Sequence, residues 1–236
     1  MDPVQDNFTA KDLIDSYYCR FENQHVTKVY FKLLIPNACV GNLVGNHGDR
    51  IRSIGADHRV YVSVEKFKHY REYRSCLRIL RINGEPVRCV AACMNCVDIL
   101  MKDLKVDGDL TQKLSLDFIL PDVLIQYMEE GGNKQDRQDI FQSMAKETNT
   151  DILVSEKHLP YSTERVVRIS VQSSKQSTRL QQAVHLMADQ LYENITLLMC
   201  SPYNSFYALK EPGQVLFQEQ LNALFDDDCK SHCFCQ

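Results

Sequence analysis

Two glycines, Gly45 and Gly48, lie between two short apolar segments and limit the possible folds of this chain more than any other part of its sequence. An extended apolar run covers residues 31–35 and stops at Pro36, and apolar residues then recur at helical spacing up to the first glycine. Helical spacing resumes after the second glycine. The pattern predicts a strand, a helix, a tight turn and a second helix. Glycine suits such a turn because it adopts backbone angles that a side chain forbids and lets another molecule approach closely.

The second of these helices would begin at the turn. Its first amide N–H groups and the positive end of its dipole would point toward the glycines, which makes the turn a site for an anion, typically a phosphate. After Gly55 the residues 59–64 alternate, with Val60, Val62 and Val64 on one side. This alternation predicts that a strand follows the second helix.

The order of glycines and apolar residues resembles the K-homology (KH) domain, in particular that of the Nova, poly(C)-binding protein and hnRNP K kind. The residues that carry the resemblance are Leu34-Ile35-Pro36, Val40-Gly41, Val44-Gly45, Gly48, Ile51 and the β-branched strand from Val60. In that family the turn is a GXXG loop that clamps the backbone of about four unpaired nucleotides, whose bases lie on an apolar platform. The resemblance therefore implies a groove for single-stranded RNA.

The same order of elements occurs twice in the chain, as strand, helix, helix, strand, strand, helix. The predicted fold is α+β, with two tandem type I KH domains, each a three-stranded antiparallel sheet with three helices on one face. We expect an N-terminal helical appendage over residues 1–25, a KH domain with its GXXG loop over 26–105, a degenerate KH-like domain over 110–196 and a C-terminal tail over 197–236. The residues VSVEKFKHYREYRSCLRIL of the first unit align with LVSEKHLPYSTERVVRIS of the second.

The second unit lacks the sequence of the groove. Pro121 and Ile140 are 19 positions apart, whereas the matching Pro36 and Ile51 of the first unit are 15 apart. Carboxylates at Glu129 and its neighbour would also repel a phosphate, each by about 1 kcal/mol even with strong solvent screening. We expect this unit to have been kept for packing or for contact with a protein partner.

Charge is divided unevenly along the chain, although its net value is only -4. Residues 27–105 contain 14 basic and 7 acidic residues, whereas the segments 1–26, 106–200 and 201–236 have net charges of -3, -5 and -3. Attraction to phosphate dominates the affinity of proteins for nucleic acid. RNA binding is therefore expected from the first unit alone.

Carrying the family's positions over to this chain predicts a set of RNA contacts. These residues are Val40, Gly41, Val44, Gly45, Asn46, His47, Gly48, Arg50, Ile51, Arg52, Arg59, Val60, Tyr61, Lys66 and Lys68. Family loops usually carry Lys or Arg between the glycines, and Arg50 and Arg52 would supply part of the charge that Asn46 and His47 do not. Other interpretations stay open. Ile51 and Val62 could be plain core, Arg59 could be a solvated charge, and the basic stretch around Lys66 could be a solvated loop.

Other classes of function find little support in the sequence. No P-loop, G-x-S-x-G or H-E-x-x-H motif is present, so no enzyme is predicted. Cys229, His232, Cys233 and Cys235 lack any standard zinc spacing, and no metal or cofactor is expected. No secretory signal or apolar run of about 18 residues is visible, so we expect no membrane span and cysteines kept as thiols. Cys89, Cys93 and Cys96 are expected to be buried on the helix from Pro86.

Two hypotheses of function follow. The first is binding of short, pyrimidine-rich RNA by the first unit, with the protein acting in the splicing, stability or translation of messenger RNA in the nucleus, the cytoplasm or both. The second is an adaptor whose KH folds have become protein-interaction surfaces. The N-terminal helix could dock on its own domain or support a homodimer, and the apolar face of Phe217, Leu221, Leu224 and Phe225 could dock on the second unit or bind a partner.

Overall fold

The computed structural model describes residues 28–65, 72, 75–104, 113–131, 138–198, 205–209 and 212–225 of the chain. Several predictions from the sequence therefore lie outside the described residues. They are the N-terminal helix, the basic residues Lys66 and Lys68, and the Cys-rich end of the chain.

The first half has the predicted order of elements. They are β1 (Val29–Pro36), α2 (Asn37–Val44), α3 (Asp49–His58), β2 (Tyr61–Val64), β3 (Leu77–Gly84) and α4 (Pro86–Leu104). Proline ends β1 and begins α4, the position in a helix where its missing N–H removes no hydrogen bond. A short 3-10 turn, Asn46–Gly48, joins α2 to α3 at the predicted glycine pair.

The second half repeats this order. Its elements are β4 (Leu114–Pro121), α5 (Asp122–Glu129), α6 (Ile140–Thr148), β5 (Asp151–Val154), β6 (Glu164–Val171) and α7 (Ser177–Leu198). The strands pair in the same way in both halves, with β3 between β2 and β1 and with β6 between β5 and β4. The two halves therefore share one order of elements and one pattern of strand pairing.

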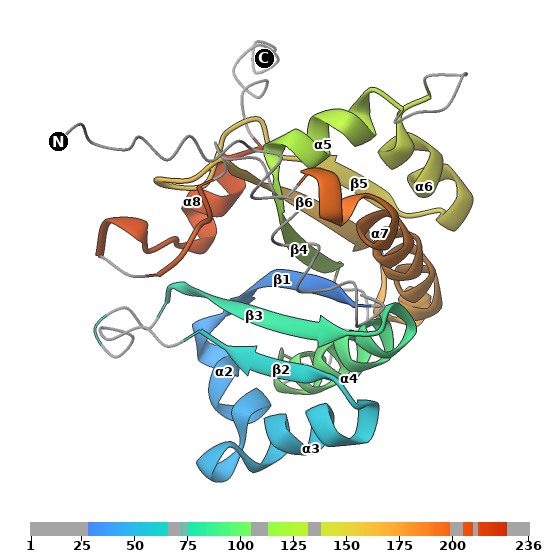
Figure 1. Ribbon diagram of the computed structural model, residues 1–236. Helices are drawn as coiled ribbons and strands as arrows, with labels where there is room; N and C mark the ends of the chain where they lie inside the picture. Colours follow the sequence, from blue (N-terminus) through green and yellow to red (C-terminus); the bar gives the residue numbers. More distant parts are fainter. Residues whose placement is uncertain are drawn as a thin grey trace, which may run out of the picture.

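All six strands form a single sheet, in the order β2-β3-β1-β4-β6-β5 (Figure 1). The sequence predicted a separate three-stranded sheet in each half and missed the antiparallel pairing of β1 with β4, which joins Leu33 to Phe118 and Leu34 to Asp117. In isolation β1 and β4 would each be an exposed, apolar edge strand, an arrangement that favours aggregation. Pairing the two edges removes that exposure.

The junction between β1 and β4 has an internal two-fold symmetry. Pro36 and Pro121 end the two strands and are 85 residues apart, so Leu33 of the first half corresponds to Phe118 of the second. These two equivalent residues are partners in the β1–β4 ladder. The halves therefore pack through the same surface of each, as the subunits of a symmetric dimer do.

One face of the sheet carries the helices and the larger apolar core. Helices α4 and α7 pack against each other and span both halves (Figure 1). Cys89, Cys93 and Cys96 of α4 are buried free thiols, which confirms the prediction made for them. Burial raises the pKa of Cys89 and of Cys96 to about 12, and it raises the pKa of Cys93 well above its usual value.

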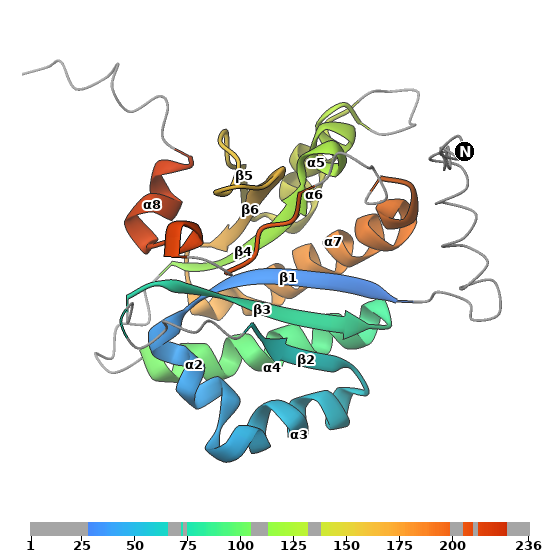
Figure 2. The ribbon, with the colours of Figure 1, turned by 60° about the vertical axis from the view of Figure 1, so that its left-hand side comes forward.

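The opposite face of the sheet is covered by the described part of the C-terminal segment, residues 205–209 and 212–225, which includes α8 (Gln218–Ala223) (Figure 2). The Leu77 amide of the first half donates to Leu216 of this segment at 2.8 Å, and the Thr163 amide of the second half donates to Ser205 at the same distance. Tyr207 lies fully buried in the apolar cluster beneath. Docking on the second half was one of the two expectations for the tail, and the described part of the tail contacts both halves.

A buried ion pair also crosses between the halves on this face. Lys32 of β1 donates through Nζ to Glu164 Oε2 at 2.5 Å and to the Tyr207 carbonyl at 2.7 Å, and the Tyr207 amide donates to the same carboxylate oxygen at 2.6 Å. The side chains of Lys32 and Glu164 are only 7% and 2% exposed. Burial lowers the pKa of Lys32 and raises that of Glu164.

In the second half, the β4 residue that corresponds to Lys32 is Asp117, and its ion-pair partner lies in the same half. Asp117 lies opposite Arg168 in the β4–β6 ladder, and Arg168 Nε donates to Asp117 Oδ1 at 2.6 Å. In the first half the equivalent pair is Lys32 opposite Arg81, two cations that repel each other. This difference explains why Lys32 takes its partner from the other half.

Two negative findings apply to the described part of the chain. None of its helices combines the length and the apolarity needed to cross a membrane. None of its His, Cys, Asp and Glu side chains gather in a group of three or more that could hold a metal ion.

Candidate nucleic-acid interface

The turn between α2 and α3 has the backbone that its glycines predict. Gly45 and Gly48 have φ values of 75° and 80°, and His47 between them has φ 50°. A hydrogen bond from the Gly45 amide to Gly41 ends α2 at 2.9 Å. The amides of Asn46 and His47 follow at the start of a single 3-10 turn, where N–H groups have no acceptor within the turn.

The two glycines are needed for different reasons. A Cβ at Gly45 would lie 2.2 Å from Asp49 Oδ1 and 2.8 Å from Arg50 Cβ, so a side chain there would push the two helices apart. A Cβ at Gly48 would meet nothing closer than 3.8 Å, and only its left-handed backbone favours glycine. Gly45 therefore allows the two helices to approach each other closely, whereas the space beside Gly48 is open.

Two arginines from the first turn of α3 lie beside the turn. Arg50 Nη1 donates to the Asn42 carbonyl at 2.5 Å and so ties the end of α2 to the start of α3. Arg52 is exposed, and its Nη1 lies 3.8 Å from the position that a Cβ on Gly48 would take. Among the described residues Arg52 has no ion-pair partner, and it supplies positive charge next to the open side of the turn.

An apolar surface lies next to the turn. Val40, Val60 and Val62 are half-buried and pack against the larger core with part of their surface. Val44 and Ile51, on the two helices that flank the turn, are half-buried and belong to neither buried cluster. Ile51 is therefore not a plain core residue, which was the alternative interpretation of its role. Apolar side chains therefore remain accessible beside the open backbone.

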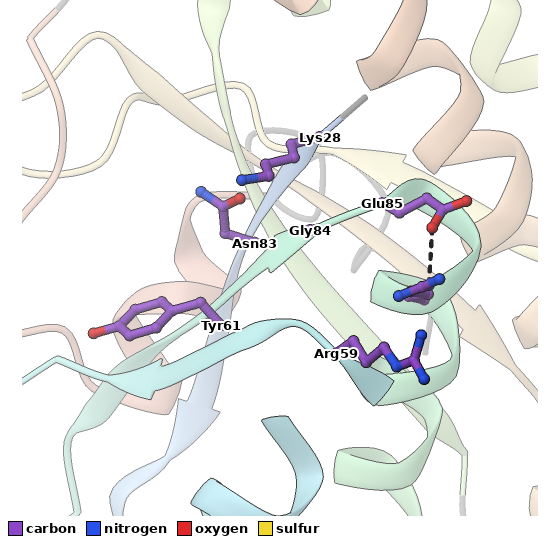
Figure 3. A pocket seen from close by; sticks show the side chains of 7 residues that line it. Lys28, Arg59, Tyr61, Asn83, Gly84 and Glu85 are labelled. Atoms are coloured by element: carbon purple, nitrogen blue, oxygen red, sulfur yellow. Dashed lines mark ion pairs between the residues drawn. The ribbon is translucent and has the colours of Figure 1, made fainter. Parts of the chain in front are cut away.

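Arg59 and Tyr61 were predicted to belong to the same groove, and the structure places them at the other end of α3. Arg59 was expected to begin a strand, but it is the left-handed C-cap of α3, with φ 53°, and its amide donates to Ala56 at 3.2 Å. Strand β2 begins only at Tyr61, which is 68% exposed. Both residues line a cavity with Lys28 and Asn83 (Figure 3).

A scan against protein families matches residues 30–98 to the KH domain. Residues 30–98 are a KH domain. This range begins in β1, contains the Gly45–Gly48 turn, and ends within α4, so the turn is the GXXG loop of the domain. The KH family is one of RNA-binding, non-enzymatic domains.

Two further comparisons add little to this assignment. No curated protein matches the chain. One solved structure that it resembles is the crystal structure of an a/eIF2alpha–aDim2p–rRNA complex from Pyrococcus horikoshii OT3. The TM-score is 0.27 and the identity 11%, over 75% of this chain and 98% of that chain, a level of likeness that supports no inference about this protein.

The second half differs from the KH domain at the start of its matching helix. In the KH domain α3 is preceded by Gly48, which has no side chain, and Asp49 in the first turn of α3 accepts from a single amide, that of Arg50, at 2.7 Å. In the second half α6 is preceded by Asp139, whose Oδ1 accepts from the Phe141 and Gln142 amides at 2.7 and 3.2 Å. Asp139 thus caps two amides at the start of α6, and its carboxylate would repel a phosphate there.

The predicted acidic residues of the second half are partly neutralised. Arg165 lies 3.0 Å from the carboxylate of Asp122 and 3.6 Å from that of Glu129. Repulsion from Glu129 is therefore weaker than the sequence implied, and the Asp139 cap is the stronger obstacle to an anion. A carboxylate just before a helix is a sequence signal that could have revealed this cap.

Sequence reasoning did not identify Lys28, Asn83 or Arg88, which line the cavity with Arg59 and Tyr61. Lys28 directly precedes β1, Asn83 lies at the end of β3 and Arg88 lies in the first turn of α4. No local motif connects such positions, because only the folding of three strand ends against a helix brings them together.

Proposed function

We propose that the KH domain binds single-stranded RNA at its GXXG loop. The observation that supports this most directly is the open turn at Asn46 and His47, with uncapped backbone amides beside the exposed Arg52. A phosphodiester placed there would accept hydrogen bonds from the turn and lie next to a guanidinium group. Bases would then rest on the apolar surface that includes Val44 and Ile51.

The proposal assigns RNA binding to the first half alone. In the second half Asp139 caps the start of the matching helix, α6, and this half is also acidic overall, whereas residues 27–105 have an excess of positive charge. We assign the second half to a degenerate KH-type unit, on the basis of its element order and strand pairing. Its role would be to support the KH domain or to contact a protein partner.

Changing the charge of the loop tests the proposal in both directions. Asn46→Asp with His47→Asp places two carboxylates at the turn, and aspartate tolerates the left-handed backbone of His47. Each carboxylate should repel a phosphate by about 1 kcal/mol, so affinity for a single-stranded pyrimidine oligonucleotide should fall about 10- to 100-fold. Asn46→Lys with His47→Lys should raise affinity at least about tenfold. Fluorescence anisotropy at fixed salt measures both.

A matched control adds the same charge elsewhere. Gln138→Asp with Gln142→Asp changes two exposed residues at the start of α6 and should leave RNA affinity unchanged. The lysine variant should also bind with a steeper dependence on salt, by about 0.7 in the logarithmic slope for each additional phosphate that the lysines neutralise. Equal affinities for the aspartate, lysine and wild-type proteins would reject the GXXG loop as the RNA site.

Gly41 offers a second test because folding and binding should respond in opposite directions. It lies exposed within α2, and a Cβ added there would meet no atom within 4 Å. Gly41→Ala should therefore raise the free energy of unfolding by about 0.5–1 kcal/mol, because alanine is the better helix former. If RNA lies against this backbone, the added methyl should weaken binding about 5- to 150-fold. Chemical denaturation and anisotropy on the same sample would show the two changes.

The biological targets are a further part of the proposal. By resemblance to its family, the protein would select pyrimidine-rich messenger RNA and act on splicing, stability or translation in the nucleus or the cytoplasm. Crosslinking in cells, followed by sequencing of the bound transcripts, would test this. The alternative, a protein-interaction adaptor, draws on the lysine-free loop and the capped α6. It predicts that the purified protein ignores RNA at physiological salt and that the lysine variant does not gain affinity.

A further inference from the structure

A second basic site lies at the opposite end of α3 from the GXXG loop. It is a cavity of about 440 Å³, lined by residues that include Lys28, Arg59, Tyr61, Asn83 and Arg88 (Figure 3). The ring of Tyr61 is exposed at one side of the cavity. The cations come from three separate parts of the chain, with Lys28 just before β1, Arg59 just after α3 and Arg88 in α4. An aromatic face beside several cations is the combination that binds a base and its backbone phosphate.

The positive charge of this cavity is not balanced within the described residues. Glu85 is the one carboxylate that lines it, and it pairs with Arg88 at 2.8 Å. No described carboxylate lies within ion-pair distance of Lys28 or Arg59. Like charges that share one concave surface repel each other, so a bound anion would stabilise the arrangement.

The second half supplies an internal comparison for this site. Matching the strand ladders places Lys113 at the position of Lys28 and Asp151 at the position of Tyr61. Lys113 and Asp151 lie 3.9 Å apart and neutralise each other. The fold itself therefore does not require an aromatic ring and unpaired cations here, and the half whose matching helix is capped by Asp139 lacks them.

The cavity is placed to continue a strand that starts at the GXXG loop. Helix α3 has 10 residues and is about 15 Å long, with the loop at its N-terminus and Arg59 at its C-terminus. At about 3.4 Å for each stacked nucleotide, this length corresponds to about four nucleotides. A strand of four nucleotides along α3 would end at the cavity.

We infer that this cavity binds the base and phosphate of a nucleotide beyond those held at the GXXG loop. Tyr61 stacks on the base, while Lys28 and Arg59 contact the phosphate. The inference rests on the proposed RNA-binding function and adds to it a preference for longer single strands. An RNA long enough to reach the cavity is bound more tightly than one that fills only the groove.

Two oligocytidines of different length test the inference. Anisotropy would compare a tetranucleotide with an octanucleotide on the full chain carrying Asn46→Lys and His47→Lys, so that binding of the shorter one can be measured. The octanucleotide should bind at least about tenfold more tightly than the tetranucleotide, since each stacked base contributes about 5- to 150-fold in affinity. Adding Lys28→Ala and Tyr61→Ala should abolish most of this gain and leave the tetranucleotide unaffected.

The controls separate this inference from the proposed function. Lys113→Ala with Asp151→Ala changes the matching positions of the second half and should alter neither affinity. If the gain with length survives in the Lys28 and Tyr61 variant, or both oligonucleotides weaken equally, the separate site is disproved while binding at the loop stands. If neither oligonucleotide binds the protein that carries only Asn46→Lys and His47→Lys, the proposed function fails and this inference with it. Equal competition by oligoglutamate would also overturn the assignment to RNA.

Discussion

Replacing Lys32 with methionine is expected to lower the free energy of unfolding by about 3–5 kcal/mol. The substitution leaves the Glu164 carboxylate, which is 2% exposed, with its charge unpaired between the two halves. The Tyr207 carbonyl also loses the Lys32 donor that lies 2.7 Å away. Since domains of this size are stable by about 5–15 kcal/mol, the loss would be a large fraction of the total. Chemical denaturation followed by circular dichroism measures it.

The double variant Lys32→Met, Glu164→Gln tests whether the unpaired charge is the cause. Glutamine can still accept a hydrogen bond from the Tyr207 amide, which now donates to Glu164 at 2.6 Å. Removing both charges should recover most of the stability and bring the double variant within about 2 kcal/mol of the wild type. A double variant less stable than Lys32→Met alone, or a single variant within about 1 kcal/mol of wild type, would contradict this account.

Truncating Tyr207 to alanine is the second change expected to have a large effect. Its ring is fully buried in the cluster between the sheet and the C-terminal segment, so the loss should be about 3–5 kcal/mol in the free energy of unfolding. The segment that Tyr207 anchors contacts both halves of the sheet. We therefore expect this variant to loosen the junction between β1 and β4 as well, which hydrogen exchange at these strands would detect.

Tyr207→Phe is the matched control for the truncation. It keeps the ring and removes only the hydroxyl, which donates to the Gln214 carbonyl at 2.5 Å. The expected loss is about 1 kcal/mol, the usual net value of one hydrogen bond. If phenylalanine were as damaging as alanine, the hydrogen bond rather than the packing of the ring would hold the segment in place.

The two stability predictions concern the frame that holds the RNA site rather than the site itself. Lys32 and Tyr207 lie on the face of the sheet opposite the helices, away from the GXXG loop that joins α2 and α3. Their conservative variants, Tyr207→Phe and the Lys32, Glu164 pair, should therefore leave RNA affinity unchanged. The loop variants, in contrast, change exposed residues and should affect binding without affecting stability.

Local sequence patterns predicted most of the elements correctly. Helix α4 runs from Pro86 to Leu104 as expected, because proline favours a first turn and the apolar residues that follow recur at helical spacing. The tight turn at Gly45 and Gly48 was also correct, since few sequences can form it. Arg59 was an exception. Side-chain alternation predicted that it begins a strand, but its backbone is left-handed and ends α3.

Contacts between distant segments could not be predicted in the same way. The β1–β4 ladder involves only two residue pairs, and nothing local distinguishes those strands from buried strands of separate sheets. The isolated bridge from Cys76 to Phe217 likewise joins residues far apart in sequence. Apolar surface is non-directional, so the sequence indicated that these residues would be buried without indicating against what.

For the candidate site, the loop, its glycines and the excess of positive charge around it could be predicted from the residues alone, because backbone angles and charge are properties of the residues themselves. The position of Arg59 and Tyr61 at the far end of α3, in a second basic cavity, became visible only in the folded chain, and so did the Asp139 cap on the matching helix of the second half. Such sites depend on which strand ends and helix starts meet in space, and that follows from packing rather than from any one segment.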